Sequence, residues 1–348
     1  MTIFEQLDYY GHEQLIFGRD EKTGMKCIIS IHNTALGPAT GGTRFWNYAT
    51  EEDALYDVLR LSRGMSLKNA AAGLALGGGK AVIIGDPEKL KSEEFFQAYG
   101  RIVDSLGGKY YTAEDVNINE DDIAKIKSAT PYVTGTKEIS GNPSPFTAKG
   151  VYKGMKAGAS VKFGTDSLNG LVVAVQGLGS VGYRLCEMLH AEGAVLKVFD
   201  INQNAVDKAV AKLGAQAVGA KEILVTGCDI FAPCALGAVL DVNNAKLLQC
   251  KMICGAANNV LADAETCDVL EFMDVLYLPD YIVNAGGVIN CGEEITQKTY
   301  DAAVVGAKVD RIYDTVLEIV KLAKEKDIST YLAADEYAYG IIRAAAKR

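Results

Sequence analysis

A run of glycines near the middle of this 348-residue chain constrains its fold more than any other feature. An apolar segment at 171–175, typical of a buried strand, leads into the run, and a helical pattern begins at Tyr183. The run is Gly177-Leu178-Gly179-Ser180-Val181-Gly182. In such a unit the first glycine permits a tight turn, the second lets the backbone approach a pyrophosphate, and the third allows close packing of helix on strand. We therefore predict a dinucleotide-binding unit in a doubly wound α/β domain with a parallel sheet.

The acidic residue that such a unit needs after its second strand is Asp200. It follows the apolar segment 195–199, about twenty residues beyond the glycines, where a carboxylate accepts hydrogen bonds from both ribose hydroxyls. The next residue, Ile201, is not a cation, so a 2′-phosphate would meet an uncompensated negative charge. The sequence thus predicts NAD rather than NADP. The alternative is a glycine turn that only packs a helix on a sheet, which leaves the position of the acid unexplained.

The length predicts two domains, since about 150 residues is typical of one. Residues 1–135 alternate expected strands and helices, which is typical of an α/β domain. Turn-forming residues crowd 132–147 and predict a hinge. The second domain is expected at 136–325, and the C-terminal helical residues 326–348 are expected to pack back across both domains.

Several local elements follow from capping residues and apolar spacing. Strands are expected at 26–32 and 81–84, and helices after Thr50, near Ser92 and at 147–163. Beyond Tyr300 the chain is expected to be helical. Its apolar residues are spaced alternately by four and three: Val305, Val309, Ile312, Val316, Ile319 and Ala323.

Charge and composition exclude several classes of protein. The chain has 44 acidic and 35 basic residues, a formal net charge of -9, which disfavours binding to phosphate backbones and acidic lipid surfaces. No apolar run approaches the roughly 20 residues of a membrane span. The N-terminus carries Glu5 where a signal peptide would carry positive charge. We expect a cytoplasmic protein with neither nucleic acid nor membrane as partner.

The cysteines and histidines favour neither a metal site nor a histidine catalyst. The eight cysteines contain no C-x-x-C pair and mostly lie in apolar contexts, so we interpret them as small buried thiols. Three histidines, His12, His32 and His190, offer little for a zinc site or a catalytic triad. We expect no metal and an acid–base catalyst of another residue type.

Lys80 is the first candidate for that catalyst. It ends the glycine run 77–79 and precedes an apolar strand, where desolvation lowers the pKa of a lysine toward that of a general base. Ala81 stands where a P-loop would have a magnesium-binding Ser or Thr. Lys68, in a similarly apolar stretch, and Asp115, after an expected strand, could complete a site for an anionic substrate. The alternative is that each lysine points into solvent, as most lysines do.

Further segments complete a pattern that covers nearly the whole chain. They are residues 37–44 (Gly-Pro-Ala-Thr-Gly-Gly-Thr-Arg), the surroundings of Lys68, Lys80 and Asp115, the run 177–182, and residues 256–259 and 279–287. Together they resemble the glutamate/leucine/phenylalanine/valine dehydrogenase family. The resemblance implies an N-terminal domain that binds substrate and forms oligomers, a Rossmann-type NAD domain, and a catalytic cleft between them. The implied reaction is oxidative deamination of an L-amino acid to the 2-oxo acid, ammonia and NADH, and its reverse.

The resemblance also implies a role for each site residue. Lys68 binds the substrate carboxylate, Lys80 activates water against the imino intermediate, and Asp115 carries protons to and from the departing nitrogen. Three residues position the substrate: Gly41, Gly42 and Asn284. Two contact the nicotinamide end of the cofactor: Asn259 and Thr147.

By the same resemblance, the walls of the side-chain pocket are Thr40, Ala113, Val288 and Cys291. Glutamate-specific members have a lysine in place of Thr40 and a hydroxyl residue in place of Val288, and without that cation a buried side-chain carboxylate is unfavourable. Leucine-specific members have larger aliphatic residues at positions 40 and 291, while Asn290 is typical of them. We predict leucine, valine and isoleucine as substrates, with phenylalanine as the alternative.

Two other classes compete with this interpretation. A 2-hydroxy-acid dehydrogenase shares the cofactor domain but relies on a histidine and an arginine, and histidines are scarce here. A non-enzymatic NAD-binding regulator predicts the loss of a catalytic residue, whereas Lys68, Lys80 and Asp115 are all present. Members of the resembled family are usually homo-oligomers, often octamers, so we expect an oligomer.

Overall fold

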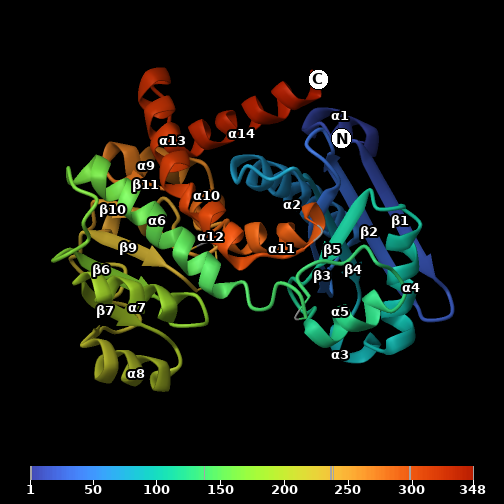
Figure 1. Cartoon of the computed structure of the whole chain (residues 1–348), viewed down its shortest axis with the longest axis horizontal. Coiled ribbons are helices and arrows are strands. Elements are labelled where there is room, and N and C mark those ends of the chain that lie inside the picture. Colours follow the sequence, from blue (N-terminus) through green and yellow to red (C-terminus); the bar gives the residue numbers. More distant parts are fainter. Residues whose placement is uncertain (1, 137, 236, 238, 298, 348) are drawn as a thin grey trace. The chain divides into compact units, whose positions relative to one another are not determined.

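The computed structural model describes every residue except 1, 137, 236, 238, 298 and 348, and its chain forms two compact units (Figure 1). The first consists of Met1–Gly141, Asn290–Ala302 and Ala338–Arg348, and the second of Asn142–Ile289 and Ala303–Tyr337. The division after Gly141 lies within the expected hinge, beyond the expected boundary at residue 135. Residues 290–302, which the sequence places in the second domain, belong to the first unit.

The first unit is built on a five-stranded sheet with the order β1-β2-β4-β3-β5. Strands β1 and β4 are each antiparallel to β2, whereas β3 is parallel to β4 and β5. The strands are β1 (Gln14–Asp20), β2 (Met25–Asn33), β3 (Ala39–Trp46), β4 (Gly77–Ile84) and β5 (Tyr110–Ala113). The helices are α1 (Ile3–Tyr10), α2 (Glu51–Ala71), α3 (Pro87–Leu90), α4 (Glu93–Asp104) and α5 (Glu120–Lys127).

Two of these helices begin where their capping residues predict. The Thr50 side chain accepts a hydrogen bond from Asp53 N, and the Asp53 carboxylate accepts one from Thr50 N, so a capping box starts α2. The Ser92 side chain accepts from Phe95 N at the start of α4. Both expected helix starts are confirmed.

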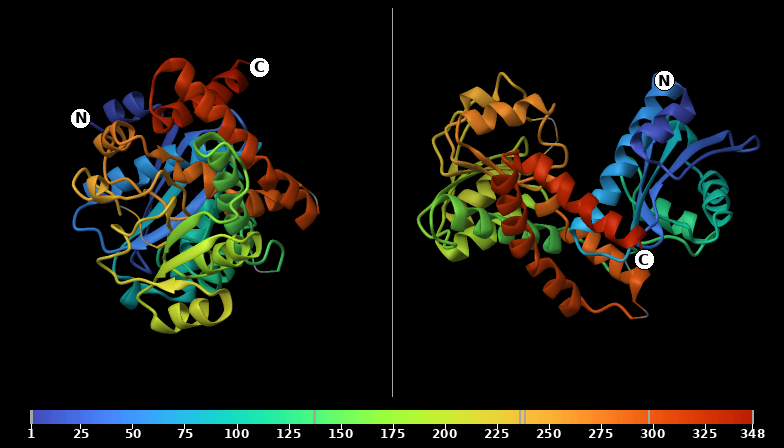
Figure 2. Two further views of the ribbon diagram at one scale, coloured as in Figure 1. Left: turned by 90° about the vertical axis from the view of Figure 1, so that its left-hand side faces the viewer. Right: turned by 90° about the horizontal axis from the view of Figure 1, so that it is seen from above.

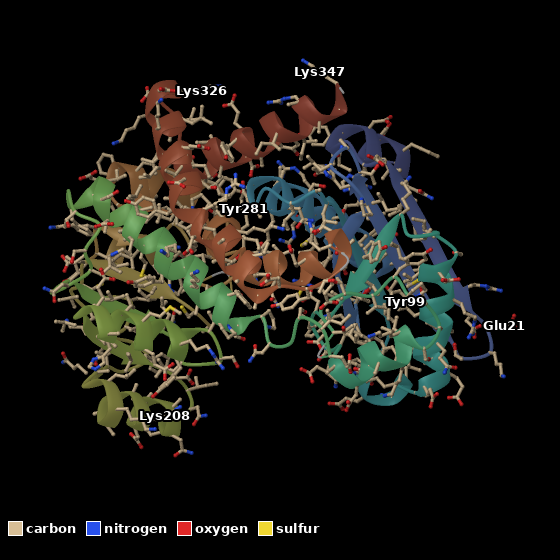
Figure 3. The ribbon with its side chains drawn as sticks, in the orientation of Figure 1. Glu21, Tyr99, Lys208, Tyr281, Lys326 and Lys347 are labelled. Atoms are coloured by element: carbon tan, nitrogen blue, oxygen red, sulfur yellow. The ribbon has the colours of Figure 1, made fainter. Side chains whose placement is uncertain are left out.

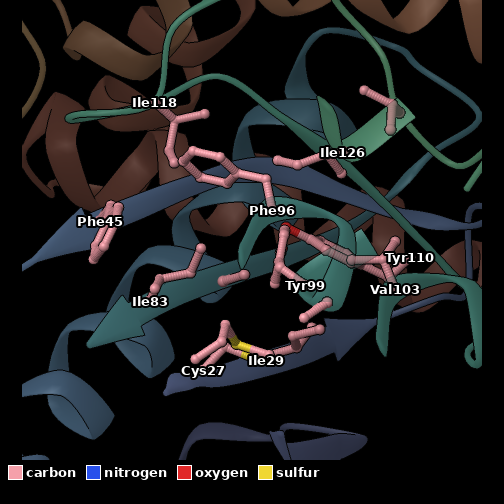
Figure 4. Packing of buried hydrophobic residues seen from close by; sticks show 14 of the residues in the cluster. Cys27, Ile29, Phe45, Ile83, Phe96, Tyr99, Val103, Tyr110, Ile118 and Ile126 are labelled. Carbon is pink, nitrogen blue, oxygen red and sulfur yellow. The ribbon is translucent and has the colours of Figure 1, made fainter. Parts of the chain in front are cut away.

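Apolar side chains cover both faces of the first sheet. One face packs against α4 and α5 in a cluster whose largest members are aromatic (Figure 4): Phe45, Phe95, Phe96, Tyr99 and Tyr110. On the other face, Ile28 and Val82 pack with Leu59 of α2. The central strand β4 is therefore buried on both sides.

The glycines before Lys80 belong to β4 itself, so the expected strand start at residue 81 was wrong. A Cβ atom at Gly78 would lie 2.1 Å from Ser66 N. Helix α2 thus lies directly on this part of the strand, and only residues without a side chain fit beneath it.

The second unit contains a six-stranded sheet with the order β11-β10-β9-β6-β7-β8, in which the described pairs are all parallel. The strands are β6 (Val172–Gln176), β7 (Val195–Phe199), β8 (Gln216–Ala217), β9 (Ile230–Pro233), β10 (Met252–Ile253) and β11 (Leu276–Tyr277). Counted in chain order from the β8 edge, this is the 3-2-1-4-5-6 arrangement of the Rossmann fold. The predicted doubly wound parallel sheet is confirmed.

Helices pack against this sheet, with α7 and α8 on β7 and α9 on β11 (Figure 2). The elements before the C-terminal region are α6 (Ser144–Lys162), α7 (Gly182–Glu192), α8 (Gln203–Leu213), the short 3₁₀ helix η1 (Ala245–Leu247), α9 (Glu265–Phe272), α10 (Asp280–Val283) and α11 (Gly286–Thr296). Helix α6 begins at Ser144 rather than at residue 147, with a proline in its first turn, a position that proline favours.

The C-terminal region is helical as expected, but it is divided into α12 (Ala302–Asp310), α13 (Ile312–Lys326) and α14 (Thr330–Ala346). Helix α13 ends because Asp327 adopts a left-handed conformation with φ of 54°. The Tyr281 hydroxyl, labelled in Figure 3, donates to Asp335 Oδ1 at 3.0 Å and joins α10 to α14. The predicted apolar positions are all buried: Val305, Val309, Ile312, Val316, Ile319 and Ala323. Among the described residues, no helix combines the length and the apolar character that crossing a membrane requires.

Candidate active site

A buried lysine and an aspartate meet in the first unit. Lys80, in β4, is 6% exposed, and its Nζ donates a hydrogen bond to Asp115 Oδ2. Asp115 lies just beyond β5, where its Oδ1 accepts a hydrogen bond from Val116 N at 2.8 Å. The two residues that the sequence proposed for acid–base work are thus in direct contact.

An arginine that sequence reasoning did not single out joins this pair. Arg44 Nε lies 3.3 Å from Asp115 Oδ2, and Arg44 Nη1 lies 3.1 Å from Asp57 Oδ2. Asp57 also accepts hydrogen bonds from the Tyr48 hydroxyl at 2.8 Å and from Arg60 Nη2 at 3.1 Å. Asp57 therefore fixes the guanidinium that contacts Asp115. The only sequence signal for Arg44 was its position at the end of the 37–44 motif. Its partner Asp57 belongs to no motif that we identified in the sequence.

Burial and charge shift the pKa values of the pair. Burial lowers the pKa of Lys80 because its charge is poorly solvated; the Asp115 carboxylate opposes this shift and Arg44 adds to it. For Asp115, burial acts to raise the pKa, but the positive charges of Lys80 and Arg44 outweigh it, and the pKa is lowered. The site therefore combines an ionised carboxylate with a lysine that releases its proton more readily, as a general base requires.

Two glycines of β3 let the segments that carry this pair pack closely against the strand. A Cβ atom at Gly42 would lie 2.2 Å from Glu114 O and 2.9 Å from Asp115 Cβ. At Gly41 it would lie 2.0 Å from Gly79 O. Substitution at either position would displace the strands that carry Lys80 and Asp115.

Lys68 lies in the last turn of α2 and is partly buried. Helix α2 contacts β4 where Ser66 lies against Gly78. Lys68 is two residues after Ser66, and Lys80 is two residues after Gly78. The fold thus brings the segments of both lysines to one region of the first unit.

Of the expected pocket walls, Thr40, Ala113 and Cys291 belong to the first unit and Val288 to the second. The Thr40 hydroxyl donates to Tyr111 O at 3.3 Å, beside the end of β5 where Ala113 lies. The Cys291 carbonyl accepts from Thr134 Oγ1 at 2.6 Å. Burial raises the pKa of the Cys291 thiol to about 12, so this wall is uncharged.

The glycine run in the second unit has the geometry of a pyrophosphate cradle. Gly177 has φ of 101°, which is rare for other residues, and a Cβ atom at Gly182 would lie 2.0 Å from Gly177 O. At Gly179 a Cβ atom would meet nothing within 4 Å, and Gly179 and Ser180 are exposed. Helix α7 begins without a side-chain cap, which is compatible with an anion at that end.

Asp200 lies beside this run. Its Oδ2 accepts from Leu178 N at 2.5 Å, and its Oδ1 accepts from Asn202 N at 2.7 Å. The residues present therefore fit the pyrophosphate and adenosine ribose of a dinucleotide, with Val181 and Leu178 as the remaining members of the loop.

The two expected nicotinamide contacts, Asn259 and Thr147, and the expected substrate-positioning residue Asn284 lie on three segments of the second unit. Asn284 Nδ2 donates to Asn258 Oδ1 at 2.9 Å and to Ala256 O at 3.2 Å, which places it beside the segment that carries Asn259. Asn259 itself has a left-handed backbone with φ of 52°. A Cβ atom at Gly287 would lie 2.8 Å from Thr147 Oγ1, so Thr147 lies against the start of α11, next to Val288.

Comparison with known proteins agrees with this chemistry. A family model described as "Glu/Leu/Phe/Val dehydrogenase, dimerisation domain" matches residues 12–132, and one described as "Glutamate/Leucine/Phenylalanine/Valine dehydrogenase" matches residues 195–348. Leucine dehydrogenase of Bacillus cereus is 51% identical over 341 residues, covering 97% of this chain and 93% of that protein. Valine dehydrogenase of Streptomyces virginiae is 46% identical over 343 residues, covering 97% and 95%.

Solved structures share the fold. The crystal structure of L-tryptophan dehydrogenase from Nostoc punctiforme matches with a TM-score of 0.90 and 43% identity over 99% of each chain. Fold, glycine loop and lysine–aspartate pair together define an oxidoreductase that uses a nicotinamide cofactor. The chain belongs to the glutamate/leucine/phenylalanine/valine dehydrogenase family and is an amino acid dehydrogenase. The resemblance seen in the sequence is confirmed.

Proposed function

We propose that this protein catalyses the NAD-dependent oxidative deamination of a branched-chain L-amino acid, leucine, valine or isoleucine, and the reverse reductive amination. The products are the 2-oxo acid, ammonia and NADH. The observation that carries the proposal is the buried contact between Lys80 and Asp115 beside two side-chain-free glycines, in a chain 51% identical to leucine dehydrogenase.

The residues of the first unit act on the amino acid. Lys68 binds the substrate carboxylate, and Gly41 and Gly42 help to position the substrate. Lys80, whose pKa is lowered mainly by burial, removes a proton from the water that attacks the imino carbon. Asp115 is ionised before the reaction, because Lys80 and Arg44 lower its pKa, and it then exchanges protons with the substrate nitrogen.

The residues of the second unit hold the cofactor. The loop from Gly177 to Gly182 binds the pyrophosphate, Asp200 the adenosine ribose, and Thr147 and Asn259 the nicotinamide end, while Asn284 helps to position the substrate. When bound, NAD would supply the hydride acceptor for oxidation of the substrate at Cα. NAD is favoured over NADP because Asp200 repels a 2′-phosphate, and the adjacent Ile201, 95% exposed, supplies no cation.

Substrate choice rests on the pocket walls Thr40, Ala113, Val288 and Cys291. None of them carries a charge, so a second substrate carboxylate would lose its hydration without gaining a partner. Glutamate should therefore be rejected steeply. Discrimination among aliphatic side chains should be shallow, because one methylene is worth only about 1–3 kcal/mol in a hydrophobic pocket.

A panel of substrates tests the reaction and the pocket together. We expect kcat/KM for NAD reduction to be highest with L-leucine, L-valine or L-isoleucine and far lower with L-glutamate. Lys80→Ala should keep NAD affinity but lose turnover by about 10²–10⁴-fold, the usual contribution of a positioned acid–base group. A Lys80→Ala enzyme that kept a tenth of the activity would contradict the role of Lys80.

The panel also separates the alternatives. L-tryptophan dehydrogenase of Nostoc punctiforme is 45% identical over 335 residues, so tryptophan and phenylalanine both belong in the panel. Preference for an aromatic amino acid would support the alternative substrate class, and preference for glutamate would overturn the pocket argument. Oxidation of 2-hydroxy acids in place of amino acids would contradict the proposed reaction.

A further inference from the structure

Two cysteines stand opposite each other at the start of neighbouring strands in the second unit. The ladder between β9 and β10 pairs Ile230 with Met252 and Phe231 with Ile253. Cys228 and Cys250 each precede the first of these pairs by two residues. Both cysteines belong to one hydrophobic cluster, in which Cys250 is buried and Cys228 is partly buried.

The backbone around the two cysteines brings them within bonding range. Cys228 N donates to Gln249 O at 3.1 Å, so the pairing of the two strands extends to this point. Adjacent strands are about 4.8 Å apart, within the roughly 4.4–6.8 Å between Cα atoms that a disulfide spans. The two thiols are close enough to shift each other's pKa. The ladder is also irregular here, since Asp229 O accepts from both Lys251 N and Met252 N.

The surroundings make the two thiols unequal. Cys228 is partly exposed and Cys250 is buried. Lys197 Nζ donates to Gly227 O at 2.7 Å, so a positive charge lies beside Cys228. The neighbouring Cys250 thiol lowers the pKa of Cys228, and Lys197 adds to this shift, while burial and Asp229 oppose it. The neighbouring Cys228 thiol and burial raise the pKa of Cys250. Cys228 is therefore the stronger candidate for a thiolate nucleophile.

We propose that Cys228 and Cys250 form a redox-active dithiol that hydroperoxides oxidise to an intramolecular disulfide. The Cys228 thiolate attacks the peroxide, the O–O bond breaks, and Cys228 becomes a sulfenic acid as water leaves. The Cys250 sulfur then attacks the Cys228 sulfur, the S–O bond breaks, and a second water leaves. Two thiols and one hydrogen peroxide thus give one disulfide and two waters.

This site is separate from the proposed cofactor site. Cys228 and Cys250 precede β9 and β10, whereas Gly177 and Asp200 follow β6 and β7 of the same parallel sheet. The cysteines therefore lie at the amino ends of the parallel strands, and the glycine loop lies at their carboxyl ends. Oxidation of the dithiol does not depend on the substrate or on the proposed reaction.

The test counts thiols and maps the new bond, so it needs no activity assay. The folded full-length protein is treated with a few equivalents of hydrogen peroxide, and remaining thiols are alkylated under denaturing conditions. We expect loss of two of the eight thiols and a cross-linked peptide pair containing Cys228 and Cys250, lighter by two hydrogens. Dithiothreitol should restore both thiols.

Variants assign the two roles. Cys250→Ser should leave a sulfenic acid at Cys228 that dimedone traps, and Cys228→Ser should abolish the disulfide. Cys267→Ser is the matched control, because Cys267 lies in the same hydrophobic cluster as Cys250 and burial raises its pKa to about 12. This control should behave as the unmodified protein.

Three results would overturn the proposal. The unmodified protein could keep all eight thiols, it could form a disulfide between other cysteines, or Cys228 could proceed to the sulfinic acid without cross-linking. Peptide mapping of the disulfides and oxidised cysteines in the unmodified protein distinguishes these three results, even if a serine variant fails to fold.

Discussion

Asp115 accepts hydrogen bonds from two cations at once, Lys80 and Arg44, and this arrangement sets the charge on both members of the proposed catalytic pair. A carboxylate shared in this way stays ionised although it is largely buried, because each cation offsets part of its lost hydration. Arg44 has a second effect, since its charge disfavours the ammonium form of Lys80. Asp57 holds Arg44 in place for both tasks.

Replacing Arg44 should therefore change the pH dependence of the reaction. Arg44 lowers the pKa of Lys80, so its removal raises that pKa, and the neutral lysine then forms only at higher pH. For Arg44→Gln we expect the rising limb of kcat/KM against pH to move upward, on the order of 0.5–1 unit. Titration of the substrate is common to both enzymes and cancels in the comparison.

Arg60→Gln is the control for this measurement. Arg60 Nη2 donates a hydrogen bond to the same Asp57 carboxylate at 3.1 Å. The Arg60 side chain is more exposed than those of Arg44 and Asp57. The pH profile of this variant should match that of the unmodified enzyme. If the pH profile of Arg44→Gln were unchanged, or moved to lower pH, Arg44 would not be lowering the pKa of Lys80.

Asp200 is the residue that should decide between NAD and NADP. Loss of a hydrogen bond to a charged group costs about 1.5–3 kcal/mol, so Asp200→Asn should lower kcat/KM with NAD by about ten- to a hundredfold. Combining Asp200→Ser with Ile201→Arg should also raise activity with NADP. The double change removes a carboxylate that repels the 2′-phosphate and adds a guanidinium that attracts it. Equal use of both cofactors by the unmodified enzyme would count against this role of Asp200.

At the scale of elements, the turn between β6 and α7 depends on two glycines for different reasons. Gly182 is required by packing, because its Cβ would meet the backbone oxygen of Gly177, which cannot move aside without shifting the strand. Gly179 faces open space in the free protein, so only a bound ligand needs its lack of a side chain.

Two alanine substitutions separate these roles. Gly182→Ala should lower the free energy of unfolding by about 1–3 kcal/mol, as overpacking usually does, and thermal or urea unfolding measures this. Gly179→Ala should unfold like the unmodified protein but bind NAD more weakly in a titration. If Gly179→Ala bound NAD with unchanged affinity, the loop would not be the pyrophosphate site.

At the scale of the whole molecule, the first unit has an edge suited to self-association. β1 is the edge strand of its sheet, and Phe17 on that strand is 58% exposed. Exposed apolar edge strands favour pairing with another chain. The family model that matches residues 12–132, and so includes β1, is described as a dimerisation domain.

We accordingly expect a homo-oligomer. Light scattering should give a mass that is a multiple of the 37.1 kDa chain. Phe17→Glu should lower that mass, because a charge at a covered edge strand loses its hydration. Phe272→Glu, at a residue of the second unit that is 94% exposed, should leave the mass unchanged. A monomeric unmodified protein would contradict the prediction.

The amino-acid sequence by itself determined the features that depend on neighbours along the chain. The turn 177–182, the position of Asp200, the helix starts at Thr50 and Ser92, and the apolar spacing beyond Tyr300 all follow from local geometry and periodicity. The sequence also named Lys80 and Asp115, because a glycine run and a family resemblance marked them. It could not show that their side chains touch.

Only the tertiary structure decided the features that depend on which strands become neighbours. Arg44 reaches Asp115 because β3 lies between β4 and β5, and Cys228 meets Cys250 because β9 pairs with β10. The glycines before Lys80 belong to β4, where α2 packs directly on Gly78. The lowered pKa of Lys80 has the same origin: desolvation is a property of the packed surroundings, and residues far apart in the chain supply those surroundings.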